Sequence, residues 1–161
     1  MSREACTVFV LDAGGTGFKF SAVRSGLEVV EPFTIPAAGQ SLDEVLNKII
    51  SGFKMIRERC GCEPAALSFS FPGPADYESG IIGDLENLPH FRGGVALGPM
   101  LEEIFRCPVF INNDGDLFAY GEALQGFLPE INRLLEQQGN PKRYHNLLGV
   151  TLGTGFGGGI V

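Results

Sequence analysis

The sequence TVFVLDAGGTGFKFSAV, residues 7–23, gives the clearest indication of how this chain folds. Residues 7–12 are β-branched and apolar, which predicts a buried strand. Residues 18–23 alternate between apolar and polar side chains, which is typical of a half-buried strand. The glycine-rich segment at residues 13–17 lies between them and predicts a tight turn. The chain therefore opens with a β-hairpin or a β-meander.

Strands and helices alternate along the rest of the chain. Ser41 and Glu44 predict a capped helix start, and Gly61 predicts the end of that helix. The long segment 75–97 predicts a functional loop with a short hairpin. Further strands are expected at 28–35, 66–71, 108–112 and 147–152, and further helices at 99–106, 114–126 and 129–138. This order predicts an α/β fold with a mostly parallel sheet and helices on its faces.

Composition excludes several classes of protein. The 161 residues include 12 Lys and Arg against 19 Asp and Glu, so the net charge is −7. An acidic chain is poorly suited to binding nucleic acid or an anionic membrane. Hydrophobic residues make up 44% of the chain, which argues against disorder, and no apolar run is long enough to span a bilayer. Without a signal-peptide pattern at the first residues, we expect a cytoplasmic protein with reduced thiols.

Cys60 and Cys62 flank a single glycine and suggest two alternatives. They are either metal ligands or two thiols at the end of a helix. No second Cys/His pair follows at zinc spacing, so the second interpretation is favoured.

The tetrapeptide Gly-Thr-Gly-Phe occurs at residues 15–18 and again at residues 153–156, each time after an apolar strand. The shared context indicates duplication and a fold of two lobes that each open with a glycine-turned hairpin. We therefore expect residues 1–145 to form one lobe and residues 146–161 to open a second.

Such glycine turns are suited to binding phosphate, because backbone N–H groups can converge on an anion where no Cβ intervenes. Lys19 adds a positive charge after the first turn. A Walker A motif is absent, and the later glycine motif lacks the helix and acidic residue of a dinucleotide-binding fold. The alternative is that both turns only close tight hairpins.

Two groups of carboxylates follow predicted strands. Asp12 is placed to hold a hydrated Mg²⁺ ion, or else to cap the turn. Asp114 lies where a parallel sheet binds ligands and could accept a proton from an attacking hydroxyl, with Asn113 hydrogen-bonding the substrate. The alternative is an ordinary N-cap from Asp114 or Asp116, and the spacing leaves the choice open.

Five short motifs occur in the same order along this chain as in one known family. They begin at Asp12, Phe71, Asn87, Asn113 and Leu152, and read DAGGTGFK, FPGP, NLP, ND and LGTGFGGG. This set resembles the ROK family (repressor, open reading frame, kinase) of sugar kinases. The resemblance covers nearly all of this chain but about half of a usual member. It implies an actin-like ATPase (ribonuclease H-like) lobe with a mixed five-stranded sheet, helices on both faces and the start of a second lobe.

The resemblance also implies a role for each matching residue. Asp114 matches the catalytic base that deprotonates a hexose or N-acetylhexosamine for attack on ATP, and Asp12 would hold Mg²⁺ through water. The phosphate-binding positions are Asp12, Gly14, Gly15, Thr16, Lys19, Gly153, Thr154, Gly155 and Gly157. The sugar-binding positions are Gly73, Asn87, Asn113 and Asp114.

Departures from the family pattern leave some properties open. Pro89-His90-Phe91 stands where the family often has Pro-Gly-Trp, and Asp116 stands where it often has Asn, so the sugar is not specified. The family's adenosine site and zinc motif lie beyond the part matched here. One lobe alone is expected to have little activity, and its exposed face could support a homodimer. The alternatives are a sugar-responsive regulator without its DNA-binding domain and a non-catalytic sugar-binding fragment.

Overall fold

The computed structural model describes residues 6–85, 88–152 and 156–161. The chain divides by its contacts into two compact units, Met1–Asn112 and Asn113–Val161, and each is described by itself. The two helices after Asn113 therefore group with the final hairpin rather than with the first unit. The predicted division at residues 145/146 stays a prediction.

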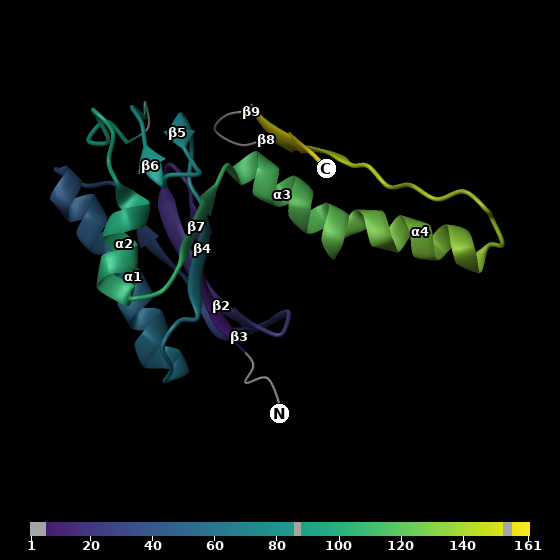
Figure 1. Ribbon diagram of the computed structural model, residues 1–161, viewed down its shortest axis with the longest axis horizontal. Helices are drawn as coiled ribbons and strands as arrows, with labels where there is room; N and C mark the ends of the chain where they lie inside the picture. The colour runs from purple at the N-terminus through teal and green to yellow at the C-terminus, as the bar shows by residue number, and fades with distance from the viewer. Residues whose placement is uncertain (1–5, 86–87, 153–155) are drawn as a thin grey trace. The chain divides into compact units, whose positions relative to one another are not determined.

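The first unit is built on a mixed five-stranded sheet, as predicted (Figure 1). Three antiparallel strands form the opening meander, and two strands continue the sheet in parallel with β1. The expectation of a mostly parallel sheet is wrong, because the meander supplies two of the four strand pairings. The strand order is β3-β2-β1-β4-β7, with bounds β1 Thr7–Ala13, β2 Gly17–Arg24, β3 Leu27–Pro36, β4 Ala66–Ser70 and β7 Val109–Asn112.

Two helices, α1 (Leu42–Cys60) and α2 (Leu97–Phe105), cover one face of this sheet (Figure 1). The Phe53 ring of α1 lies 5.7 Å from the Phe105 ring of α2 and 5.8 Å from Phe69 of β4, measured between centroids. Helical cover of both faces was predicted, and the helices of the first unit supply it on this face.

The ends of α1 follow from local sequence chemistry. Ser41 Oγ accepts a hydrogen bond from the Glu44 backbone N–H at 3.2 Å, which confirms the predicted N-cap. The Glu44 carboxylate reaches back one residue further than in a standard capping box, to the N–H of Gln40. Gly61 ends the helix in the left-handed conformation, at φ 64°, and donates to Arg57 O.

The segment after β4 contains the expected short hairpin. Two-residue strands β5 (Ala75–Asp76) and β6 (Ile81–Ile82) pair antiparallel, and Ile82 also bridges to Val95. The predicted loop is therefore ordered by a few backbone pairings where the structure describes it.

The core between the sheet and α1 is dominated by phenylalanine. Phe20 is fully buried, stacks on Phe33 at 5.5 Å and meets Phe53 edge-on at 5.4 Å. Gly52 of α1 lies against this ring, and a Cβ built on Gly52 would overlap the Phe20 ring atoms. The helix can approach the sheet this closely because residue 52 has no side chain.

Gly52→Ala is therefore expected to destabilise the protein, although alanine is the better helix former. Forcing a methyl group into this packed core costs about 2 kcal/mol net in the free energy of unfolding. Gly121→Ala is the matched control, because Gly121 is helical and its Cβ would meet nothing within 4 Å. That variant should be more stable by about 0.5–1 kcal/mol. Denaturant unfolding measures both, and equal effects of the two variants would refute the packing argument.

The second unit consists of two helices and one hairpin. These are α3 (Asp114–Leu124), α4 (Phe127–Gln137), β8 (Leu148–Leu152) and β9 (Phe156–Ile160), and β8 pairs antiparallel with β9. The second hairpin is thus confirmed.

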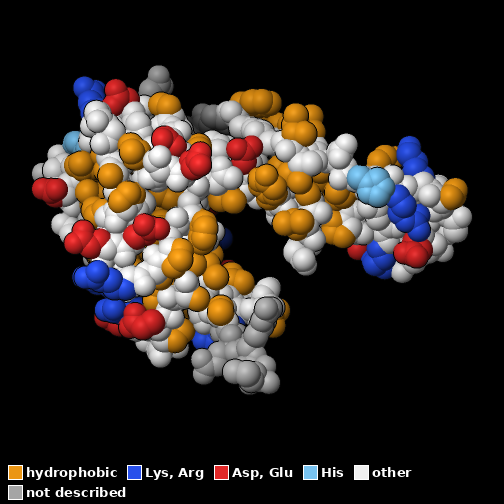
Figure 2. Space-filling model, in the orientation of Figure 1, with side chains coloured by type: hydrophobic (Ala, Val, Ile, Leu, Met, Phe, Trp, Pro, Cys, Tyr) orange, Lys and Arg blue, Asp and Glu red, His pale blue; other side chains and the backbone are white. Residues whose placement is uncertain are grey.

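Hydrophobic side chains are exposed over α3 and this hairpin (Figure 2), among them Leu124, Leu148, Leu152, Phe156 and Ile160. In the part of the chain that is described, no helix is long and apolar enough to span a membrane.

Candidate functional site

The polar residues of the first unit gather where its strands end. Asp12, Ser70 and Asn112 occupy neighbouring register positions near the carboxyl ends of the parallel strands β1, β4 and β7. Lys19 is opposite Asp12 on the antiparallel strand β2. We call these four residues the polar row. Since the buried residues Leu11, Phe69 and Ile111 pair one position earlier, the polar row faces away from α1 and α2.

The link between Asp12 and Ser70 fixes one side of the row. Ser70 is buried, and its Oγ donates to Asp12 Oδ1 at 2.8 Å. The Asp12 carboxylate itself is exposed. One carboxylate oxygen is therefore held by the sheet, and the side chain presents a negative charge to solvent at the carboxyl edge.

The glycine turn between β1 and β2 lies directly beside this carboxylate. Gly14 N donates to Gly17 O at 3.0 Å, which closes the turn, and Ala37 N donates to Thr16 O. Gly15, Thr16 and Lys19 are exposed. Of the predicted first phosphate motif, Asp12, Gly15, Thr16 and Lys19 are thus exposed near the end of the hairpin, and Gly14 is partly buried.

The segment after β4 carries the predicted residue Gly73. Phe71 N donates to Asn112 O, so this segment continues alongside the end of β7. The Tyr77 hydroxyl donates to Phe71 O at 2.9 Å, and a Cβ on Gly73 would lie 3.1 Å from that hydroxyl oxygen. Gly73 is exposed in a turn that contains a cis peptide bond to Pro74. Asn87, the other sugar-binding position predicted in this region, lies outside the described residues.

In the second unit, Asn113 and Asp114 begin α3. Asn113 is the N-cap, and its Oδ1 accepts from Gly115 N at 2.8 Å. The alternative that Asp114 or Asp116 caps the helix is wrong, because Asn113 before them has the extended backbone that an N-cap requires. Asp114 Oδ1 accepts from the same Gly115 N–H at 2.9 Å. The Asp114 carboxylate therefore lies in the first turn of α3, where the helix dipole stabilises negative charge.

The second glycine motif is described only in part, since Gly153, Thr154 and Gly155 lie outside the described residues. Gly157 lies in β9, and its Cβ would be 2.6 Å from Thr151 Oγ1 and 3.9 Å from Asp114 Oδ1. A Cβ on Gly159 would be 2.8 Å from Asp116 Cα. The glycines of β9 therefore let the hairpin approach the first turn of α3, which is a packing role that the sequence did not indicate.

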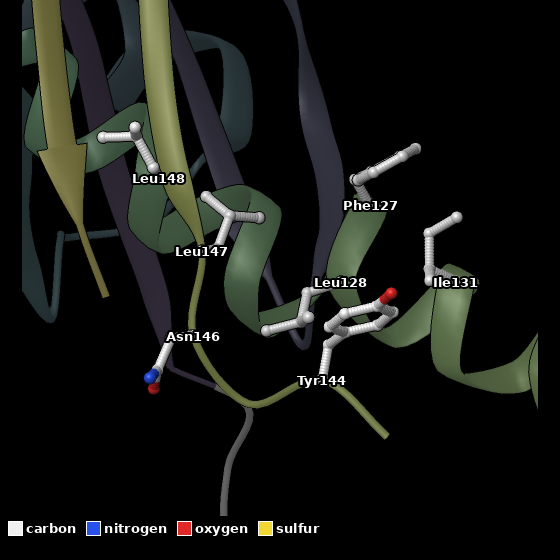
Figure 3. Close-up of a pocket in the computed structure, with 7 residues that line it drawn as sticks. All are labelled: Phe127, Leu128, Ile131, Tyr144, Asn146, Leu147 and Leu148. Carbon is white, nitrogen blue, oxygen red and sulfur yellow. The ribbon is translucent and has the colours of Figure 1, made fainter. Parts of the chain in front are cut away.

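An apolar groove of the second unit contains none of the predicted site residues. It lies between α4 and the segment leading into β8, and Figure 3 shows the side chains that line it. Tyr144 N donates to Asn132 Oδ1, and Asn132 Nδ2 donates to Tyr144 O, which fixes that segment along α4. Among the residues that line this groove none is charged, and it contains no predicted catalytic residue, so it is not our candidate catalytic site.

Sequence reasoning missed two members of the polar row, Ser70 and Asn112. Both are the last residue of a strand that runs parallel to β1, and that position was the available signal. Lys19 and Asp12 had been predicted, and the structure places them in one row with the two missed residues.

In the comparisons with known proteins, this chain is similar to several sugar kinases. The N-acetyl-D-glucosamine kinase of Aliivibrio salmonicida is 31% identical over 150 residues, which cover 93% of this chain and 44% of that protein. A crystal structure of glucokinase from Parabacteroides distasonis is 61% identical with a TM-score of 0.85, covering 99% of this chain and 45% of that one. A ROK glucokinase from Streptomyces griseus, solved with glucose and AMPPNP, shares the fold at 22% identity with a TM-score of 0.74, over 96% of this chain and 44% of that one.

The chain thus spans less than half the length of these relatives. The predicted fold class, an actin-like α/β lobe with a mixed five-stranded sheet, is confirmed by these neighbours. The sequence model of the ROK family matches residues 8–161. Because that match includes nearly every residue, and the sheet, the glycine hairpins and the motif order all agree with it, this chain belongs to the ROK family.

Proposed function

We propose that this chain carries the sugar- and phosphate-binding part of a kinase that transfers the γ-phosphoryl group of ATP to a hydroxyl of a hexose or N-acetylhexosamine. The observation that carries the proposal is the polar row, with its carboxylate and ammonium groups at the carboxyl edge of the sheet. Ligands of open α/β sheets bind at that edge. The names of the relatives, N-acetylglucosamine kinase and glucokinase, support the substrate class.

The residues of the first hairpin fit phosphate chemically. In the turn at residues 14–17, Gly15 and Thr16 are exposed and Thr16 carries a hydroxyl group, while Lys19 supplies a positive charge three residues further on. Phosphoryl transfer depends mainly on positioning and on stabilising charge at the transferred group. These residues would hold and orient the phosphates of ATP.

Asp12 fits an Mg²⁺ ion held through water. Mg²⁺ prefers oxygen ligands and keeps several of its waters, and Asp12 presents an exposed carboxylate whose Oδ1 is fixed by Ser70. When bound, the ion would neutralise charge on the phosphates. Ser70 acts here as a positioning residue, because it fixes the rotamer of Asp12 without itself reaching solvent.

Asp114 is proposed as the general base. Its carboxylate would accept the proton of the attacking sugar hydroxyl, and its bond from Gly115 N–H fixes the carboxylate's orientation. Asn113, Asn87 and Gly73 are proposed to contact the sugar, and Gly153, Thr154, Gly155 and Gly157 to contact phosphate. Asn113 would do so while also capping α3.

Asp12→Asn is expected to lower kcat/KM for ATP by about 10²-fold, because a neutral amide holds a hydrated cation far less well than a carboxylate. The measurement is a coupled assay of sugar-dependent ADP formation by a natural protein that contains this sequence, at varied Mg²⁺ concentration. Raising Mg²⁺ should restore part of the loss.

Glu31→Gln is the matched control for Asp12→Asn, because it removes one exposed carboxylate from β3, away from the polar row, and should leave kcat/KM unchanged. Equal effects of the two substitutions would argue against a specific role of Asp12.

The 161-residue chain alone is proposed to have little activity, because kinases of this kind close two lobes around the nucleotide to exclude water. We further propose a cytoplasmic location.

A further inference from the structure

Two thiols meet at the carboxyl end of α1, outside the proposed kinase site. Cys60 is the last residue of α1, and Cys62 follows the helix-ending Gly61. The left-handed turn at Gly61 brings the two side chains together, and the Sγ atoms lie 3.1 Å apart. Both residues are half-buried and so remain partly accessible to solvent. We propose that Cys60 and Cys62 form a redox-active dithiol that a low-molecular-weight disulfide converts to an intramolecular disulfide bond.

The geometry around the pair distinguishes the two sulfurs. Arg24 Nη2 donates to Cys62 Sγ at 3.5 Å, and Arg24 Nε donates to Thr7 Oγ1 at 2.7 Å. Cys60 Sγ instead lies near two carbonyl oxygens, Arg57 O at 3.7 Å and Cys62 O at 3.5 Å, and can only donate to them. A positive donor thus faces Cys62, and acceptors face Cys60.

These contacts make Cys62 the nucleophile. The hydrogen bond from the Cys60 thiol lowers the pKa of Cys62, and Thr7 and Arg24 lower it further. Partial burial, together with the bond to Cys62, raises the pKa of Cys60. Of the two thiols, Cys62 is therefore the more readily deprotonated, and the thiolate is the species that attacks disulfides.

The reaction takes place in two exchange steps. The Cys62 thiolate attacks one sulfur of the small disulfide, whose S–S bond breaks and releases one thiolate, which takes a proton from water. Cys60 then loses its proton to solvent and attacks Cys62 Sγ, which releases the second small thiol and closes the Cys60–Cys62 bond. Two protein thiols are oxidised, and one small disulfide is reduced to two thiols.

This site is separate from the polar row. Cys62 contacts the residues at the start of β1 and the end of β2, whereas Asp12 lies near the other end of β1. A metal-binding role is not favoured, since the described residues contain no group of three His, Cys, Asp or Glu side chains able to hold a metal ion. The inference therefore does not depend on the proposed kinase activity.

The test treats the folded chain with oxidised glutathione at neutral pH, blocks remaining thiols with N-ethylmaleimide and maps the products by mass spectrometry. The expected product has lost two hydrogen atoms, with the bond between Cys60 and Cys62. In the Cys60→Ser variant the reaction should stop after one glutathione has been added to Cys62. The Cys62→Ser variant should form no disulfide bond, and Cys60 should add glutathione more slowly than Cys62 does in the Cys60→Ser variant. Cys107→Ser is the control, because burial raises the pKa of Cys107 and that thiol should react slowly.

Arg24→Gln should slow the first step several-fold. Arg57→Gln is its matched control, because Arg57 is also near the pair but its guanidinium lies 3.7 Å from Glu63 instead of contacting a sulfur. A disulfide that maps to Cys6 or Cys107, or two thiols that stay reduced, would overturn the proposal. Equal slowing by both arginine variants would overturn the assignment of Cys62 as the nucleophile.

Discussion

Asp114→Asn is expected to lower kcat for sugar phosphorylation by about 10²–10⁴-fold, which is the usual contribution of a positioned general base. Asparagine keeps the size of the side chain and can still accept the hydrogen bond from Gly115 N–H, so α3 should stay intact. Sugar binding should change much less than kcat, because the amide oxygen of asparagine can still accept a hydrogen bond from the sugar hydroxyl. The measurements are steady-state kinetics and calorimetry of sugar binding, both on a natural protein that contains this sequence.

Asp116→Asn provides the matched control for this experiment. Asp116 lies two residues further along the same first turn and carries the same charge. That substitution should leave kcat within about tenfold of the wild type, since a residue that acts only near the reaction contributes far less than the base. If Asp116→Asn is the more damaging of the two, Asp114 is not the base.

Phe53→Ala is expected to produce the largest loss of stability, about 3–5 kcal/mol in the free energy of unfolding. Phe53 is fully buried, and its ring meets Phe20, Phe69 and Phe105 at centroid distances of 5.4–5.8 Å. Phe53 therefore contacts β2, β4 and α2 at once. A loss of this size is a large fraction of the total stability of an ordinary domain.

Denaturant unfolding followed by circular dichroism measures this loss. Phe53→Leu keeps most of the volume and should cost less than Phe53→Ala, which allows a measurement if the alanine variant does not fold. Phe110→Ala removes a ring that is 61% exposed in β7 and should change stability by less than about 1 kcal/mol. Comparable losses at positions 53 and 110 would contradict the assignment of the core.

The elements that sequence predicted well are those whose limits depend on local chemistry. The hairpin at residues 7–23 was predictable because period-two patterning flanks a glycine turn. Ser41 and Gly61 fixed both ends of α1 because capping needs only neighbouring residues. The start of α4 was placed at Pro129, two residues late, because proline is tolerated in the first turn and does not mark its first residue.

The features that sequence could not predict depend on contacts between distant residues. Ser70 holds Asp12 across 58 positions in sequence, and only the parallel register of β1 and β4 brings them together. Gly157 of β9 was predicted to bind phosphate, whereas no role was predicted for Gly149 of β8 or Gly159 of β9, which allow close packing on α3. A glycine in such a motif can serve either phosphate binding or close packing, and its packing partner is known only once the fold is known.

Detection of phosphoryl transfer from ATP to a sugar tests the proposed kinase function itself. A natural protein that contains this sequence would be incubated with Mg²⁺, γ-³²P-labelled ATP and a panel of hexoses and N-acetylhexosamines. Labelled sugar phosphate would then be separated and counted. The account predicts a labelled product with at least one of these sugars, reduced to near background by Asp114→Asn. A folded product that binds ATP but labels none of these sugars, or labels them equally with asparagine at position 114, would contradict it.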